Sequence, residues 1–141
     1  MVHRRLCCRR APGDVAVVSA TRVVYIAMLY RAETPWKREK NIHAARDFAL
    51  WLWKRGYAVI CPHANSAHFD GELPDEIWLE RYLEILARCD AIALGPGWRH
   101  SEGAKAELRY AIKLGKTVMW GLSIMPGGRV DAQITEILQE A

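Results

Sequence analysis

The chain has 141 residues, of which 51% are hydrophobic and 26% charged, a composition that is typical of one globular domain and excludes a disordered chain. No apolar run reaches the roughly 18 residues that a membrane-spanning helix needs, so we expect no membrane association. The formal net charge of +4 lies entirely in residues 1–22, which contain five arginines and one acid. The neutral remainder lacks the broad basic surface that nucleic-acid binding requires, so we expect no nucleic-acid partner.

The first residues and the rest of the chain are expected to differ in structure. We interpret residues 1–21 as a basic tail without fixed structure, and residues 22–141 as a single α/β domain. An apolar, β-rich run over residues 22–29 predicts a strand that is buried on both faces. Thr34, which precedes a proline, predicts the start of a helix that ends at Gly56.

Strand-like and helix-like segments alternate through the rest of the chain. Short apolar runs predict strands over residues 57–61, 90–94 and 117–120, and helices are predicted to begin near Pro74, Ser101 and Val130. Residues 62–73 are predicted to form a polar loop. This alternation favours a three-layer α/β domain of the flavodoxin-like or Rossmann-like kind, with a four- or five-stranded parallel sheet between helices.

The first predicted helix carries a run of large apolar residues from Leu50 to Trp53. Four consecutive residues cannot share one face of a helix. We interpret Trp51 and Trp53 as part of a surface through which the chain forms a homo-oligomer. The alternative is a wide core-facing stripe that leaves a tryptophan exposed.

Ligands of parallel sheets bind beyond the carboxyl ends of the strands, and a polar segment follows the third predicted strand at that edge. Ser101, with free backbone N–H groups near Gly103, forms a natural cradle for an anion or phosphate. Glu107 lies about one turn further and would face the same opening, where its carboxylate could act as nucleophile or base. The alternative is a capped helix in which Glu107 makes a surface ion pair.

A second polar segment follows the second predicted strand at the same edge. We expect its polar side chains to contact a ligand, and a hydrogen-bonded loop is the alternative. A metal bound by Cys61, His63 and His68 is the weaker interpretation, because this spacing matches no established metal site. The sequence also lacks the GxGxxG and GxxxxGK[ST] motifs, and we expect neither a metal nor a cofactor.

The four cysteines form neither a CxxC pair nor a zinc-ligand spacing. Two of them lie in the expected tail, and the other two, Cys61 and Cys89, lie in apolar surroundings. We therefore expect reduced thiols in a cytoplasmic protein.

The polar segments and strands also carry motifs in a familiar order. These motifs are Tyr25-Ile26-Ala27, Pro62-His63-x-Asn65-Ser66-Ala67-His68-Phe69-Asp70-Gly71, Leu86-x-x-Cys89-Asp90-Ala91 and Gly97-Trp98-x-x-Ser101-x-Gly103-Ala104-x-x-Glu107. On them the chain resembles the nucleoside 2-deoxyribosyltransferases and the 2′-deoxynucleoside 5′-phosphate N-hydrolases over about residues 23–120. The resemblance is greatest to the poorly characterised phage and bacterial branch of that superfamily.

The resemblance implies a flavodoxin-like enzyme that cleaves or exchanges the N-glycosidic bond of a (deoxy)nucleoside or its 5′-monophosphate. It implies that Glu107 attacks C1′ and that Tyr25 orients this glutamate. It also implies that Ser101 and Gly103 hold the sugar 5′ end or its phosphate. The other candidates for substrate contact are Trp98, His63, Asn65, His68 and Arg31.

The chain departs from this superfamily at the expected general acid. Tyr82 stands where the family has an aspartate, and a tyrosine is a poor acid at neutral pH. Asp70 and Asp75 are further candidates for the proton donor. Met28 and Leu29 stand where the family commonly has small residues near the sugar. A catalytically impaired nucleotide-binding or sensing module on the same fold is therefore the alternative function.

Overall fold

The computed structural model describes residues 22–121 and 123–139, so the expected tail and Glu140, the predicted last residue of the C-terminal helix, lie outside the described residues. Its elements are β1 (Val23–Ala27), α1 (Pro35–Trp53), β2 (Ala58–Ile60), α2 (Pro62–Asn65), α3 (Asp75–Ala87), β3 (Ala91–Leu94), a 3₁₀ turn η1 (Trp98–His100), α4 (Glu102–Lys113), β4 (Thr117–Trp120), β5 (Ser123–Met125) and α5 (Ala132–Gln139). Within the described ranges, no helix is both long enough and apolar enough to span a membrane.

The strands form one sheet in the order β2-β1-β3-β4-β5, which is the flavodoxin-like order. The first four strands are parallel, as predicted, and β5 pairs with β4 antiparallel. The sequence interpretation did not separate β5 from the segment that leads to the last helix. Gly121, with a φ of +60°, lies at the turn that reverses the chain between β4 and β5.

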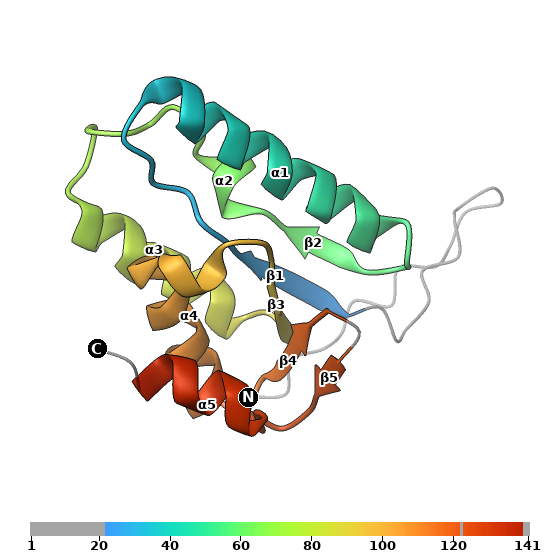
Figure 1. Ribbon diagram of the computed structural model, residues 1–141. Coiled ribbons are helices and arrows are strands. Elements are labelled where there is room, and N and C mark those ends of the chain that lie inside the picture. The colour runs from blue at the N-terminus through green and yellow to red at the C-terminus, as the bar shows by residue number, and fades with distance from the viewer. Residues whose placement is uncertain (1–21, 122, 140–141) are drawn as a thin grey trace, which may run out of the picture.

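Helices cover both faces of the sheet, which confirms the three-layer α/β fold (Figure 1). Successive side chains of a β-strand point to opposite faces of its sheet, and β1 follows this rule. Tyr25 and Ala27 pack on the side of α3, α4 and α5, whereas Val24 and Ile26 pack on the side of α1. The sequence run that looked continuously apolar is therefore divided between two cores.

The large apolar side chains at the tryptophan-rich end of α1 point in different directions around the helix. Leu52 is 1% exposed and belongs to the core, whereas Leu50, Trp51 and Trp53 are 53%, 38% and 52% exposed. The guanidinium of Arg55 lies 3.4 Å from the centre of the Trp51 ring. The helix thus presents an apolar surface to solvent as well as to the sheet.

The amino and carboxyl edges of the sheet have different roles. At the amino edge, the Asp90 carboxylate accepts the backbone N–H of Val23 at 2.8 Å, so it joins β3 to β1 rather than reaching a ligand. At the carboxyl edge, Pro62–Asn65 form the short helix α2, where we predicted a loop. Proline at the first position favours this turn, and the Cys61 carbonyl accepts the N–H of Asn65 at 3.0 Å.

Candidate active site

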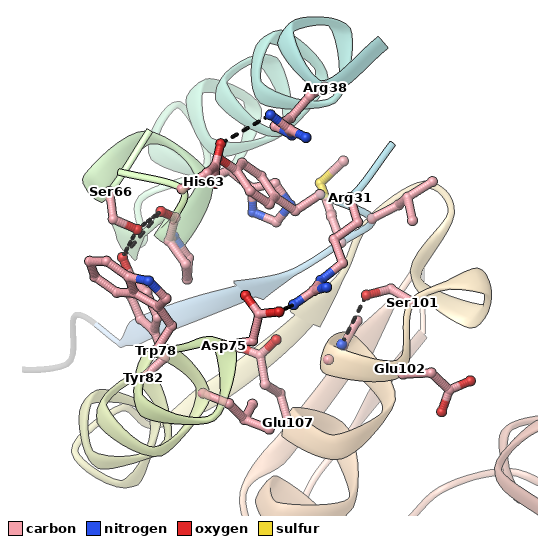
Figure 2. A pocket seen from close by; sticks show the side chains of 18 of the residues that line it. Arg31, Arg38, His63, Ser66, Asp75, Trp78, Tyr82, Ser101, Glu102 and Glu107 are labelled. Atoms are coloured by element: carbon pink, nitrogen blue, oxygen red, sulfur yellow. Dashed lines mark hydrogen bonds and ion pairs between the residues drawn. The ribbon is translucent and has the colours of Figure 1, made fainter. Parts of the chain in front are cut away.

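A cavity of about 720 Å³ opens at the carboxyl edge of the sheet. Its walls come from the end of β1, from α2, from the first turns of α3 and from the start of α4 (Figure 2). The predicted site residues that line it are Tyr25, Arg31, His63, Asp70, Tyr82, Ser101, Gly103 and Glu107. The volume is within the range of small-molecule sites.

Three predicted substrate contacts do not line the cavity. Trp98 is 3% exposed and packs in the core with its ring edge-on to Trp120, because η1 turns it inward. Asn65 uses its amide to donate to the Tyr82 hydroxyl at 3.3 Å. His68 has a φ of +67° and a largely exposed ring that lies 3.3 Å from the Glu39 carboxylate.

The start of α4 presents polar groups to the cavity. Ser101 is the N-cap residue, and its Oγ accepts the Ala104 N–H at 3.1 Å, which leaves the hydroxyl proton available to a ligand. A side chain at Gly103 would meet only Ser101 Oγ, 3.8 Å away, so a ligand can approach this backbone closely. Such a helix start favours a hydrogen-bond acceptor or an anion.

Glu107 lies further along the same helix and reaches the cavity from below. Its side chain is partly accessible through the cavity. Burial raises the pKa of Glu107 to about 7, and the nearby Tyr25 hydroxyl opposes this rise. At neutral pH, Glu107 therefore exists both as the carboxylate, which can attack carbon, and as the acid.

Tyr25 approaches Glu107 from β1. Its side chain is fully buried, and burial, followed by the nearby Glu107, raises its pKa well above the ordinary value. The hydroxyl is a hydrogen-bond donor near the Glu107 carboxylate, and it has no hydrogen-bond partner among the described residues. This hydroxyl therefore has an unused proton beside the Glu107 carboxylate.

Tyr82 reaches the cavity from α3, with its ring edge-on to Tyr25 at 6.4 Å between ring centres. Its hydroxyl shares a hydrogen bond with Ser66 Oγ at 2.6 Å and lies 3.3 Å from the Pro62 carbonyl. These bonds, with the one from Asn65, tie α3 to α2. The residue at the expected general-acid position therefore supports the cavity wall.

Two ion pairs lie at the mouth of the cavity. Arg31 pairs with Asp75 at 2.5 Å, and Arg38 pairs with Asp70 at 3.3 Å. The Tyr30 hydroxyl also donates to Asp70 at 2.7 Å, so both oxygens of this predicted catalytic carboxylate already accept hydrogen bonds. Burial, and then the bond to Asp70, raises the pKa of Tyr30 to about 12.

His63 lies in the cavity wall with unused hydrogen-bonding capacity. It is 7% exposed, and neither ring nitrogen has a partner among the described residues. Burial lowers its pKa, so the ring is neutral at neutral pH and offers one donor and one acceptor. A ligand in the cavity would supply the missing partner.

Sequence reasoning missed the aromatic part of the wall. Phe69 and Trp78 line the cavity with ring centres 6.2 Å apart, and Phe69 is 52% exposed. Trp78 lies one turn before Tyr82 on α3, and this helical spacing was the available signal. Such rings can stack against a flat ligand ring.

Met28 and Leu29, which depart from the superfamily pattern, also line the cavity. Met28 packs tightly against Gly95, where an added Cβ would lie 2.1 Å from the Met28 Cγ.

In the described ranges, no three histidine, cysteine or acidic side chains lie close enough together to hold a metal ion. Cys61, His63 and His68 therefore do not form a metal site in this structure.

Comparison with known proteins bears on the identity of the fold. Residues 23–120, from β1 to β4, match a family described as "Domain of unknown function (DUF4406)". The chain belongs to this family. The matched range is also the range over which the motifs indicated a resemblance.

Among solved structures, the DUF4406 chain is similar to the CMP N-glycosidase BcmB of Clostridium botulinum. The two are 18% identical, the alignment covers 70% of each chain, and the TM-score is 0.48. No curated protein matches the chain.

Proposed function

We propose that this protein cleaves or exchanges the N-glycosidic bond of a (deoxy)nucleoside or its 5′-monophosphate, with Glu107 as the nucleophile. The observation that carries the proposal is the position of Glu107, a carboxyl with a pKa of about 7 that reaches a nucleoside-sized cavity beside the Tyr25 hydroxyl. The sequence resemblance supports the same chemistry.

In the first step, one oxygen of the Glu107 carboxylate attacks C1′. The bond from C1′ to the base nitrogen breaks, its electron pair leaves with the base, and the base gains a proton. In the second step, water or another base attacks C1′ and releases the Glu107 carboxylate. Water gives hydrolysis, and a second base gives transfer.

Tyr25 is the proposed positioning residue for this attack. Its hydroxyl would donate to the Glu107 oxygen that does not attack. This bond also stabilises the charged form, since it lowers the pKa of Glu107. Tyr82 and Asp70 remain the proposed proton donors to the base. Each would first have to break a hydrogen bond that it makes in this structure.

The remaining wall fits the other parts of a nucleoside. We place the base against Phe69 and Trp78, with His63 as its hydrogen-bonding partner. Ser101 and Gly103 would then hold the 5′ end of the sugar.

The first test is a panel of nucleosides and 5′-monophosphates, with free base measured by chromatography. We expect the wild type to release base from some member and Glu107→Ala to be at least about 10³-fold slower, because the nucleophile is lost. Glu136→Ala, an exposed helical glutamate on α5, is the matched control and should retain activity. Normal turnover by Glu107→Ala would refute the mechanism.

A binding or sensing module is the alternative, and the engaged hydroxyl of Tyr82 favours it. This function predicts tight binding of a nucleoside or nucleotide by the wild type, with no base released over hours. Tyr82→Asp would then gain base release, since the substitution supplies the missing carboxylic acid. If the wild type binds no nucleoside and no nucleotide, this alternative is wrong.

The proposal includes a homo-oligomer in a cytoplasmic setting. Leu50, Trp51 and Trp53 supply an exposed apolar surface on α1, which supports self-association. Cys61 and Cys89 are free thiols, which is usual in a reducing compartment. Light scattering of the wild type beside Trp53→Glu would show whether this surface joins copies of the chain.

A further inference from the structure

Carboxylates dominate the charged lining of the cavity. The cations in the lining are Arg31 and Arg38, and the acids, apart from Glu107, are Asp70, Asp75, Glu76 and Glu102. Asp70, Asp75 and Glu102 each pair with a cation, so Glu76 carries the remaining excess of negative charge, which disfavours anionic ligands.

Each arginine in the lining already has a carboxylate partner. Arg31 is neutralised by Asp75 at 2.5 Å, and Arg38 by Asp70 at 3.3 Å. Lys105, the first cation along α4, pairs with Glu102 at 3.1 Å. Glu76, in contrast, has no ion-pair partner in the part of the chain that the structure describes. The cavity therefore offers an incoming anion no uncompensated cation among its described residues.

Arg31 is the cation nearest to the proposed site for the sugar 5′ end. Figure 2 shows its guanidinium reaching between Asp75 and Ser101. A phosphate at Ser101 would bring a charge of about −1.5 to −2 at neutral pH. The phosphate would have to share Arg31 with Asp75, whose carboxylate would lie nearby and repel it.

The start of α4 does not by itself make the cavity favourable to an anionic ligand. Its N–H groups favour an anion, but Glu102 already places a carboxylate at the first helical position. Figure 2 shows this side chain turned away from the cavity, and Lys105 pairs with it. A sugar hydroxyl needs only the hydrogen bonds that Ser101 and Gly103 can supply.

We infer that the site selects an uncharged nucleoside over its 5′-monophosphate, and that Asp75 is the specificity-determining residue because it neutralises Arg31. This inference rests on the proposed function and names its substrate class. A nucleoside places a 5′-hydroxyl at Ser101, where no charge has to be compensated.

The test is a calorimetric measurement of binding, with the common nucleosides and their 5′-monophosphates as probes. The wild type should bind a nucleoside at least tenfold more tightly than its monophosphate. Asp75→Asn should tighten monophosphate binding by about five- to tenfold, since it frees Arg31, and should change nucleoside affinity by less than twofold. Glu84→Gln removes another exposed acid of α3, one that pairs with Arg88 outside this cavity, and should change neither affinity.

A second variant keeps the inference testable if Asp75→Asn does not fold. The double variant Arg31→Gln/Asp75→Asn should change monophosphate binding by less than twofold, because the ion pair that it removes carries no net charge. A loss of tenfold or more would show that Arg31 binds phosphate and would overturn the inference. Tighter binding of monophosphates by the wild type, or no binding of any probe, would also overturn it.

Binding and turnover separate the two proposals. Selective nucleoside binding without release of base would refute the proposed reaction and leave the specificity intact. Base release with a preference for monophosphates would support the proposed reaction and refute the nucleoside specificity.

Discussion

Glu107→Gln is expected to abolish base release and, above pH 7, to make the protein more stable than the wild type. Glutamine has nearly the shape of glutamate and can still accept the hydrogen bond of Tyr25. It cannot form the glycosyl ester, so we expect turnover to fall at least about 10³-fold. Loss of activity together with a gain in stability is typical of a catalytic group whose burial lowers the stability of the fold.

The gain in stability follows from the pKa of Glu107, which folding raises from 4.5 to about 7. Between these values the unfolded chain loses its proton before the folded chain, so the free energy of unfolding falls as pH rises. Well above pH 7 the loss is complete and amounts to about 3–4 kcal/mol, since each pKa unit corresponds to roughly 1.4 kcal/mol. Glutamine carries no such proton and avoids this loss.

Urea denaturation at pH 5 and pH 8 measures this difference. Glu107→Gln should match the wild type closely at pH 5 and exceed it at pH 8. The exposed Glu136→Gln is the control and should leave both curves unchanged. Equal destabilisation by Glu107→Gln at both pH values would mean that the carboxylate makes a structural bond instead.

The sequence predicted the fold well because its signals are local. Thr34 accepts the N–H of Lys37, and Ser101 accepts that of Ala104, so both predicted caps start the helices that they indicated. The failures are short elements. α2 spans only Pro62–Asn65, and β5 spans only Ser123–Met125, so neither is long enough to show a period.

The site was predictable where a single helix sets the geometry. Ser101, Gly103 and Glu107 lie on or beside the first two turns of α4, and regular helical spacing brings them to one opening. His68 was predicted to contact the ligand, but its left-handed backbone directs the ring to Glu39 instead. No periodic pattern predicts such a turn.

Contacts between distant segments could not be predicted. Arg38 and Asp70 are 32 residues apart, and their ion pair depends on how α1 and the segment after α2 meet. The same holds for Phe69 and Trp78, which lie on either side of the turn that leads into α3. These two pairs shape the mouth of the cavity, so ligand selectivity was less visible in the sequence than the nucleophile.

The pH profile of the reaction should reveal how Tyr25 acts on Glu107. If the carboxylate attacks, kcat/KM of the wild type should rise with pH about tenfold per unit and level off near pH 7. Tyr25→Phe removes the nearby hydroxyl that lowers the pKa of Glu107, so this rise should move to higher pH. We expect a loss of about 10- to 100-fold at pH 6 and a smaller loss at pH 9, where both proteins hold the charged form.

The measurement is kcat/KM from pH 5 to pH 9 on the best substrate of the panel. Tyr57→Phe is the matched control, because Tyr57 packs on the α1 side of the sheet, away from the cavity. A uniform loss across all pH values would show that Tyr25 only positions the glutamate, without tuning its proton. A shifted midpoint would instead mean that one hydroxyl on β1 both orients the Glu107 carboxylate and determines the pH at which it becomes charged.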